Sequence, residues 1–204
     1  MHEEILIFPY SGTAIEALDC LNEQQRCIGF VSDDINFIGK TFYGVEVYDR
    51  TAFVKFSNAK VLAVNGSPTS FLKRKEIIDG LKIDDNRFIS IVHPRASISV
   101  NASIGFNVLI MAGVVITANA VIGNHICILP NTVIHHDSII NEYTLIAANA
   151  TICGNVIIGE NCYVGAASSI KNGVIIGKKT LIGIGTNVIG NITDSKVVKG
   201  NPAK

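Results

Sequence analysis

The chain has 204 residues, of which 48% are hydrophobic and 17% are charged. Its 17 basic and 17 acidic residues give a formal net charge of zero, so no surplus of positive charge points to nucleic acid or to a membrane surface. The sequence holds no run of 18 uninterrupted apolar residues, which argues against a transmembrane helix. A chain of this length can bury a sufficient core without disulfides or metals.

The cysteines are five in number, and none belongs to a Cys-x-x-Cys pair. The sequence therefore predicts neither a zinc site nor a redox motif. The first residues carry acids where a signal peptide would carry positive charge. An odd number of cysteines without such a signal favours free thiols in a reducing compartment, so we expect a cytoplasmic protein with no metal.

The first ninety residues alternate short apolar runs with turns and helical patterns. Strands are expected at residues 5–8, 27–31, 61–64 and 88–92, and helices at 14–21 and 70–81. This alternation predicts a small parallel α/β domain, which we expect to be Rossmann-like. Because His93-Pro94 marks its end, the expected domains are residues 1–93 and residues 94–204.

Polar and glycine residues follow three of the expected strands. They are Ser11, Gly12, Thr13, Asp33, Asp34, Asn65 and Gly66. Ligands of parallel α/β sheets lie at the carboxyl ends of the strands, so these residues predict a ligand-binding crevice. The same residue types also make ordinary turns, and this second interpretation stays open.

A hexapeptide repeat fills the rest of the chain. From Ile98 to Val188 every sixth residue is Ile or Val, in sixteen consecutive hexads. A fixed period of six predicts a parallel β-helix. Asn recurs three residues after the aliphatic position, and Asn tolerates the left-handed backbone of a sharp corner. Three hexads make a triangular coil, so residues 18 apart should stack at about 4.8 Å. The period does not determine the handedness of the coil.

This layout resembles the hexapeptide-repeat sugar acyltransferases, which include sialic-acid O-acetyltransferases and N-acetyltransferases of nucleotide-linked amino sugars. The resemblance is carried by the N-terminal α/β domain, the hexad array and four segments, namely IVHPRA (91–96), TVIHHD (132–137), CGNVIIG (153–159) and KGNPAK (199–204). It implies a left-handed β-helix, a homotrimer with active sites between neighbouring prisms, and acetyl-CoA as co-substrate. Outward apolar residues also favour a trimer; they are Val115, Val121, Val133, Ile139, Ile157 and Ile175.

The chain departs from the family pattern at two positions. The first turn, residues 8–13, has one glycine, and Thr13 stands where the family often has a histidine. Leu145 stands nine residues after His136, where a second histidine commonly lies near the coenzyme thioester. The sugar, its nucleotide and the groups that contact the thioester therefore stay open.

The candidate catalytic residues are His136, Asp137 and Gly154. Acyl transfer from a thioester needs a base for the proton of the nucleophile and a donor for the oxyanion. His136 falls at a corner of the prism, Asp137 follows it and can orient its ring, and Gly154 stacks above it with a backbone N–H. The alternatives are a surface turn histidine without a role, or His135 as the base.

Further residues are expected around the coenzyme. In the family, backbone groups of later coils bind it, which implies roles for Gly165, Ala166, Gly183 and Ile184, and a phosphate contact for Lys199. Cys153 could form an acyl-enzyme, but a cysteine in mid-hexad is more often a small hydrophobic residue.

Three functions compete. The first is an acetyl-CoA-dependent N-acetyltransferase that acts on a nucleotide-linked amino sugar in bacterial surface glycan biosynthesis. The second is a sugar O-acetyltransferase of the sialic-acid type, and the third is a β-helix scaffold without activity. A zinc site as in other β-helices needs three histidines around one point, and His125, His135 and His136 do not stack at multiples of 18.

Overall fold

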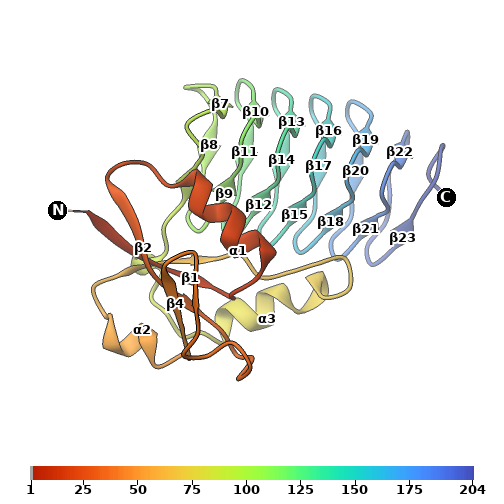
Figure 1. The fold of residues 1–204 in the computed structure, drawn as a ribbon. Coiled ribbons are helices and arrows are strands. Elements are labelled where there is room, and N and C mark those ends of the chain that lie inside the picture. The colour runs from red at the N-terminus through yellow and green to blue at the C-terminus, as the bar shows by residue number, and fades with distance from the viewer. Residues whose placement is uncertain (1) are drawn as a thin grey trace.

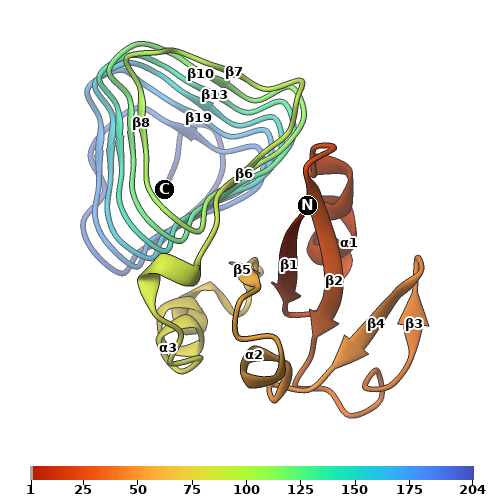
Figure 2. The same cartoon turned by 90° about the vertical axis from the view of Figure 1, so that its left-hand side faces the viewer.

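The computed structural model describes residues 2–204 and contains two parts (Figure 1). A five-stranded sheet with short helices comes first, and a prism of stacked coils follows it. Seen along its axis, the prism is a triangle, with the N-terminal sheet beside one of its sides (Figure 2).

The N-terminal sheet has the strand order β3-β4-β2-β1-β5. Its strands are β1 (Glu3–Phe8), β2 (Gln25–Val31), β3 (Thr41–Phe42), β4 (Val45–Tyr48) and β5 (Lys60–Ala63). All neighbours are parallel except β3 and β4, which form an antiparallel hairpin. The strands expected at residues 5–8, 27–31 and 61–64 are confirmed. The hairpin was not predicted, because Tyr43 and Gly44 supply the two positive φ angles in place of the usual Asn-Gly.

The helices of this domain are short. They are α1 (Gly12–Glu16), α2 (Ala52–Lys55) and α3 (Arg74–Asp79), with 3₁₀ helices at η1 (Ala17–Cys20), η2 (Phe71–Lys73) and η3 (Asp85–Arg87). The Ser11 hydroxyl begins α1 by accepting a hydrogen bond from the Ala14 amide at 3.3 Å. The helices expected at 14–21 and 70–81 therefore exist as a short α-helix joined to a 3₁₀ turn.

The strand expected at residues 88–92 is confirmed only in part, because Phe88 alone pairs with the N-terminal sheet, through an isolated parallel bridge to Val61 of β5. Only Ile91–Val92 forms a strand, β6, which pairs with β9 (Leu109–Ile110) of the prism. The Ser90 hydroxyl donates to the Gly105 carbonyl at 2.7 Å and accepts from the Val108 amide at 3.0 Å. These bonds draw the chain away from the N-terminal sheet and into the first coil.

The prism has three parallel sheets, one on each side, which we call the domain face, the mixed face and the apolar face. The domain face contains β6, β9, β12 (Cys127–Ile128), β15 (Leu145–Ile146), β18 (Tyr163–Val164), β21 (Leu181–Ile182) and β23 (Val197–Val198). The mixed face contains β7 (Ser97–Ile98), β10 (Val115–Ile116), β13 (Val133–Ile134), β16 (Thr151–Ile152), β19 (Ser169–Ile170) and β22 (Asn187–Val188). The apolar face contains β8 (Ser103–Ile104), β11 (Val121–Ile122), β14 (Ile139–Ile140), β17 (Ile157–Ile158) and β20 (Ile175–Ile176).

The register of the coils is the one that the period predicts. Val115 pairs with Val133, and Ile134 pairs with Ile152, each 18 residues apart. From β7 onward the second residue of each strand points inward and belongs to one continuous apolar core, which is buried from Ile110 onward. Positive φ angles recur at the expected corner positions, as in Asn119 and Asn155. This arrangement is consistent with the left-handed β-helix that the family resemblance implies.

The domain face is covered by the N-terminal domain. Its outward residues Ile91, Leu109, Cys127 and Leu145 share one buried cluster with residues of the N-terminal sheet, including Ile5. Residues 2–204 provide no such cover for the apolar face, where Val121, Ile139 and Ile175 are between 37% and 47% exposed. The two parts are therefore joined through a core, while an apolar surface stays open elsewhere.

A second set of contacts runs along the corner that follows the apolar face, which we call the seam corner. Four residues spaced by 18 lie there with positive φ: Asn107, His125, Tyr143 and Asn161. Each contacts the N-terminal domain through a hydrogen bond, to Ala63, Arg74, Asp79 and Leu72 respectively. The repeat thus presents one docking residue per coil to the domain.

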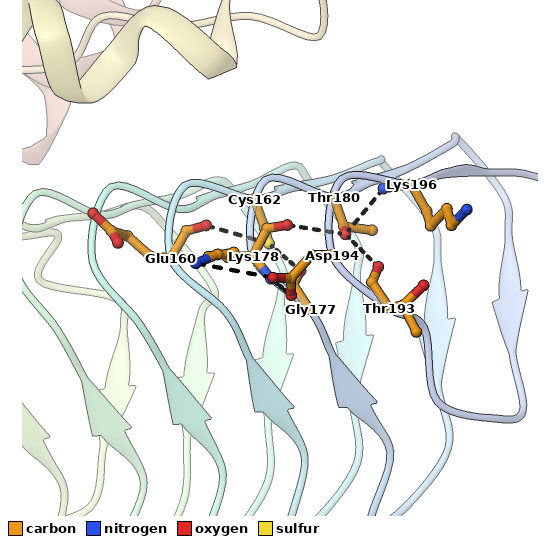
Figure 3. Close-up of polar contacts among 8 residues, drawn as sticks. All are labelled: Glu160, Cys162, Gly177, Lys178, Thr180, Thr193, Asp194 and Lys196. Atoms are coloured by element: carbon orange, nitrogen blue, oxygen red, sulfur yellow. Dashed lines mark hydrogen bonds and ion pairs between the residues drawn. The ribbon is translucent and has the colours of Figure 1, made fainter.

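The seam corner continues as a polar stack towards the C-terminus (Figure 3). Asp194 accepts from the Lys178 amide at 3.0 Å, and the Thr180 hydroxyl donates to the Thr193 carbonyl at 3.2 Å. Leu181 pairs with Val197, only 16 residues later, so the last coil is shorter than the others. These side-chain bonds close the shortened coil on the one before it.

Three further features bear on function. Within residues 2–204, no helix is both long and apolar enough to cross a membrane. The same residues contain no cluster of three histidine, cysteine or acidic side chains suited to a metal ion. All five cysteines are free thiols.

Candidate functional site

The corner that follows the mixed face, here the histidine corner, carries the candidate base. His136 lies between β13 and β14 with half of its side chain exposed. Its Nδ1 is 2.7 Å from Asp137 Oδ2. A carboxylate at this distance accepts the Nδ1 proton and leaves Nε2 with a free lone pair. The structure thus brings together the histidine and the acid that the sequence paired.

Gly154 lies on the next coil, directly against the imidazole. The Asn155 amide donates to the His136 carbonyl at 3.0 Å, which fixes this stacking. A Cβ built on Gly154 would stand 2.6 Å from His136 Cε1 and Nε2, so only glycine leaves room for the ring. The Gly154 N–H donates to no atom among residues 2–204, yet the ring covers this residue.

Asn119 was not singled out in the sequence, although it contacts the pair. Its Nδ2 donates to Asp137 Oδ1 at 3.0 Å, from the coil below. Hydrogen bonds from His136 and then from Asn119 hold the pKa of Asp137 below its usual value. The signal that could have identified Asn119 is its distance of 18 residues from Asp137.

The other histidines lie in different surroundings. His135 is half-buried and donates its backbone amide to the Ile152 carbonyl at 2.9 Å. His125 is 5% exposed in the seam, where its ring stacks on Tyr143 at 4.7 Å and Nδ1 accepts from Asn107 at 2.9 Å. Burial, and then the charge of Arg74, lowers the pKa of His125 to about 4. His125 is therefore a neutral residue of the domain interface.

A cavity of about 240 Å³ lies between the N-terminal domain and the prism. Thr13 and Gly66, at the carboxyl ends of β1 and β5, line one side of it. The opposite side comes from the domain face and the corner after it, and consists of Cys127, Leu129, Leu145, Ile146, Ala147 and Tyr163. Leu145, the residue in the place of the second histidine, thus contributes an apolar wall to the cavity.

The remaining residues of the expected crevice have other neighbours. Ser11 caps α1, and Asp33 forms an ion pair with Arg50 at 2.6 Å. Asp34 is exposed and accepts from the backbone and side chain of Asn36. Asn65 is buried and donates to the Arg74 carbonyl at 3.5 Å. All of them lie at the carboxyl end of the sheet, but they do not line the cavity.

The residues expected around the coenzyme continue the corner of the cavity. Gly165 and Gly183 occupy the position that Leu129 and Ala147 occupy on earlier coils, and Lys199 follows on the last coil. The backbones stack closely here, because a Cβ on Gly165 would meet the Ile184 nitrogen at 2.6 Å. Ile184 is 78% exposed at the same corner. We call this edge of the prism the cavity corner.

The histidine corner and the cavity corner are separate edges of one prism. The mixed face lies between them, because each coil passes from the cavity corner through this face to the histidine corner. One chain therefore holds the candidate base on one edge, and the cavity and the coenzyme residues on another.

Comparison with known proteins identifies one sequence family that part of the chain resembles. Its sequence matches the family described as bacterial transferase hexapeptide (six repeats) over residues 101–136 and 137–172. No curated protein matches the chain in sequence.

Three solved structures share its architecture over its full length. Perosamine N-acetyltransferase from Caulobacter crescentus, a variant with a histidine replaced by asparagine in complex with CoA and GDP-perosamine, has a TM-score of 0.85 at 23% identity; the match covers 100% of this chain and 96% of that one. The acetyltransferase domain of PglB from Neisseria gonorrhoeae FA1090, in complex with acetyl coenzyme A, has a TM-score of 0.86 at 20% identity, with 100% and 99% covered. WeeI from Acinetobacter baumannii AYE has a TM-score of 0.84 at 22% identity, with 100% and 99% covered. The chain thus contains hexapeptide repeats and has, along its whole length, the fold of these proteins.

Proposed function

We propose that the chain is an acetyl-CoA-dependent N-acetyltransferase that acts on a nucleotide-linked amino sugar in bacterial surface glycan biosynthesis. The observation that carries the proposal is the His136–Asp137 pair packed on Gly154. Two proteins of the same fold support the proposed ligands, since one was solved with CoA and GDP-perosamine and the other with acetyl coenzyme A.

In the proposed reaction His136 is the general base. Its Nε2 removes a proton from the amino group of the sugar as the nitrogen attacks the thioester carbonyl. The C–S bond then breaks and the acetyl group stays on the nitrogen as an amide. Coenzyme A leaves as the thiol, because the protonated His136 ring gives the proton from the amine to the sulfur. Asp137 stabilises the protonated ring, and the Gly154 N–H is the proposed donor to the oxyanion.

The proposed acceptor site combines residues 1–93 with the cavity. Thr13 and Gly66 would contact the sugar there, and Ser11, Gly12, Asp33, Asp34 and Asn65 would hold the nucleotide at the carboxyl end of the sheet. A Rossmann-like character of this domain, with its boundary at residue 93, belongs to the same proposal. Gly165, Ala166, Gly183, Ile184 and Lys199 would bind the coenzyme along the cavity corner.

The proposed assembly is a cytoplasmic homotrimer of left-handed prisms. Since the base and the cavity lie on different edges of one chain, the histidine corner of one copy would face the cavity corner of the next. The apolar face supports this arrangement, because burial of Val121, Ile139 and Ile175 removes apolar surface from water. Light scattering should give three times the chain mass, and a stable monomer at micromolar concentration would contradict the intersubunit site.

A screen of acceptors tests the activity. The purified protein is incubated with acetyl-CoA and either nucleotide-linked amino sugars, their hydroxyl analogues or sialic acid, and the released thiol is measured. We expect release with an amino sugar, and a product that resists hydroxylamine because an amide is less reactive than an ester. A hydroxylamine-sensitive product would indicate an O-acetyltransferase, and no release with any acceptor would favour a scaffold.

A further inference from the structure

Asn119 and Asp137 occupy the same corner position on consecutive coils. Both have left-handed backbones, with φ of 61° and 58°, so their side chains leave the corner in the same direction. The Asp137 amide donates to the Ala118 carbonyl at 3.0 Å and fixes one coil above the other. The register of the repeat therefore places the Asn119 amide group below the carboxylate of Asp137.

The two oxygens of Asp137 are used by different partners. Oδ1 accepts from Asn119 Nδ2 at 3.0 Å, and Oδ2 faces His136 Nδ1 at 2.7 Å. Asn119 has no other side-chain hydrogen bond among residues 2–204. We propose that Asn119 is a positioning residue of the reaction, which orients the Asp137 carboxylate so that the His136 proton stays on Nδ1 and Nε2 is free to act as the base. This inference rests on the proposed function.

The physical need for a third residue follows from exposure. The side chains of His136 and Asp137 are 50% and 44% exposed, and an exposed pair of charged groups is weakly held because water competes for both partners. A carboxylate with one partner can rotate about its side-chain bonds and release the ring. A second hydrogen bond from a neutral amide on a rigid coil restricts that rotation without adding a charge.

Two substitutions separate the amide from the corner backbone. Asn119→Gly keeps the left-handed corner, which glycine adopts without strain, and removes the amide. Asn119→Asp keeps the shape but places a second carboxylate against Asp137. Asn155→Gly is the matched control, since Asn155 has the same corner position with φ of 59° and no side-chain bond to Asp137.

The expected kinetic result is a loss in kcat alone. Asn119→Gly should lower kcat about 10- to 100-fold, the effect of one hydrogen bond to a charged group, and leave the KM for acetyl-CoA unchanged. Asn119→Asp should lose at least as much, and Asn155→Gly should stay within about twofold of the parent. In an Asp137→Ala background, Asn119→Gly should have no further effect, because it acts only through that carboxylate. Equal losses in both backgrounds would overturn the proposal.

A spectroscopic measurement decides the point without substrate. The ¹⁵N chemical shifts of the His136 ring report which nitrogen carries the proton, and Asn119→Gly should reduce the Nδ1–H form while Asn155→Gly should not. An unchanged tautomer in Asn119→Gly would refute the positioning role. If the parent protein acetylates no sugar, the proposed function fails, and the tautomer still shows whether Asn119 orients the pair.

Discussion

The N-terminal domain and the prism hold their chains in place by different means. In the prism each coil repeats the contacts of the last, with an aliphatic residue inside and a left-handed residue at each corner. The N-terminal domain has no repeat, and it is joined to the prism by a shared apolar cluster and by individual contacts such as those of Arg74, which is fully buried. After a change in one coil, the neighbouring coils can therefore maintain the fold. A change in the contacts between the N-terminal domain and the prism is not compensated by an identical contact elsewhere. The corners of the prism are thus free to carry chemistry.

The largest expected effect is on activity and concerns His136 at the histidine corner. His136→Ala should lower kcat by about 10²- to 10⁴-fold, the usual loss for a general base, while the fold stays intact because the side chain is half exposed. His135→Ala is the neighbouring control and should cost far less. Steady-state kinetics and thermal unfolding check both variants. If His135→Ala abolishes the activity and His136→Ala retains it, the base is His135; if neither variant loses activity, the mechanism fails.

The next largest expected effect is on stability and concerns Arg74, where the N-terminal domain contacts the prism. Arg74 donates to the carbonyls of Ala63, Asn65 and His125, and no carboxylate is among its hydrogen-bond partners in residues 2–204. Arg74→Ala should lower the free energy of unfolding by about 3–5 kcal/mol, because it leaves these acceptors unpaired and opens a hole.

Arg74→Met tells the two causes apart, since it fills the space but donates no hydrogen bond. It should recover part of the loss in a denaturant titration. Lys73→Ala, at an exposed neighbour, should change the stability by less than about 0.5 kcal/mol. Equal stability of Arg74→Ala and the parent would show that the domain is held by the apolar cluster alone.

The buried His125 at the seam corner should make the stability of the fold depend on pH. The pKa of His125 is lowered to about 4, first by burial and then by the charge of Arg74, whereas in the unfolded chain it returns to about 6.5. Between these values the unfolded state binds the extra proton, so the stability is full above pH 6.5 and falls as the pH drops to 4, by about 3 kcal/mol. Urea titrations at several pH values measure this slope. A His125→Asn variant with the same slope would assign the loss to other groups.

A smaller effect is expected in the N-terminal domain itself. Asp34→Ala should raise the KM for the acceptor about 3- to 10-fold, the cost of one lost hydrogen bond, and leave acetyl-CoA binding intact. Glu23→Ala, an exposed acid at the opposite end of the sheet, is the control and should have no effect. Identical kinetics of Asp34→Ala and the parent would remove Asp34 from the acceptor site.

The smallest effect is expected at Cys153, next to Gly154 on the same corner. Cys153→Ala should keep most of the activity, because direct transfer needs no covalent intermediate. Mass spectrometry of the protein after mixing with acetyl-CoA alone should find no acetyl group on this thiol. An acetylated Cys153 that disappears when the acceptor is added would replace direct transfer with a covalent route.

The sequence by itself determined the prism and the stacking at the histidine corner. An unbroken period of six leaves one register for the coils, so the placement of Ala118, His136 and Gly154 on one edge followed from spacing alone. The same rule could have found Asn119 below Asp137. Each of these positions is local, because it depends only on the neighbouring coils.

Only the tertiary structure decided the contacts that the N-terminal residues, which have no repeat, make with the prism. Arg74 reaches His125 across 51 residues. Residues 88–92 read as one strand of the N-terminal sheet, but only Phe88 pairs with that sheet, and β6 pairs with the prism. The cavity, too, formed only where Thr13 and Gly66 met the outward residues of the domain face. Such contacts depend on how two separately folded surfaces fit, and an apolar residue gives no sign of which apolar surface will cover it. The sequence patterns therefore specified the N-terminal domain and the prism separately, and the packing of the domain on the prism specified the cavity.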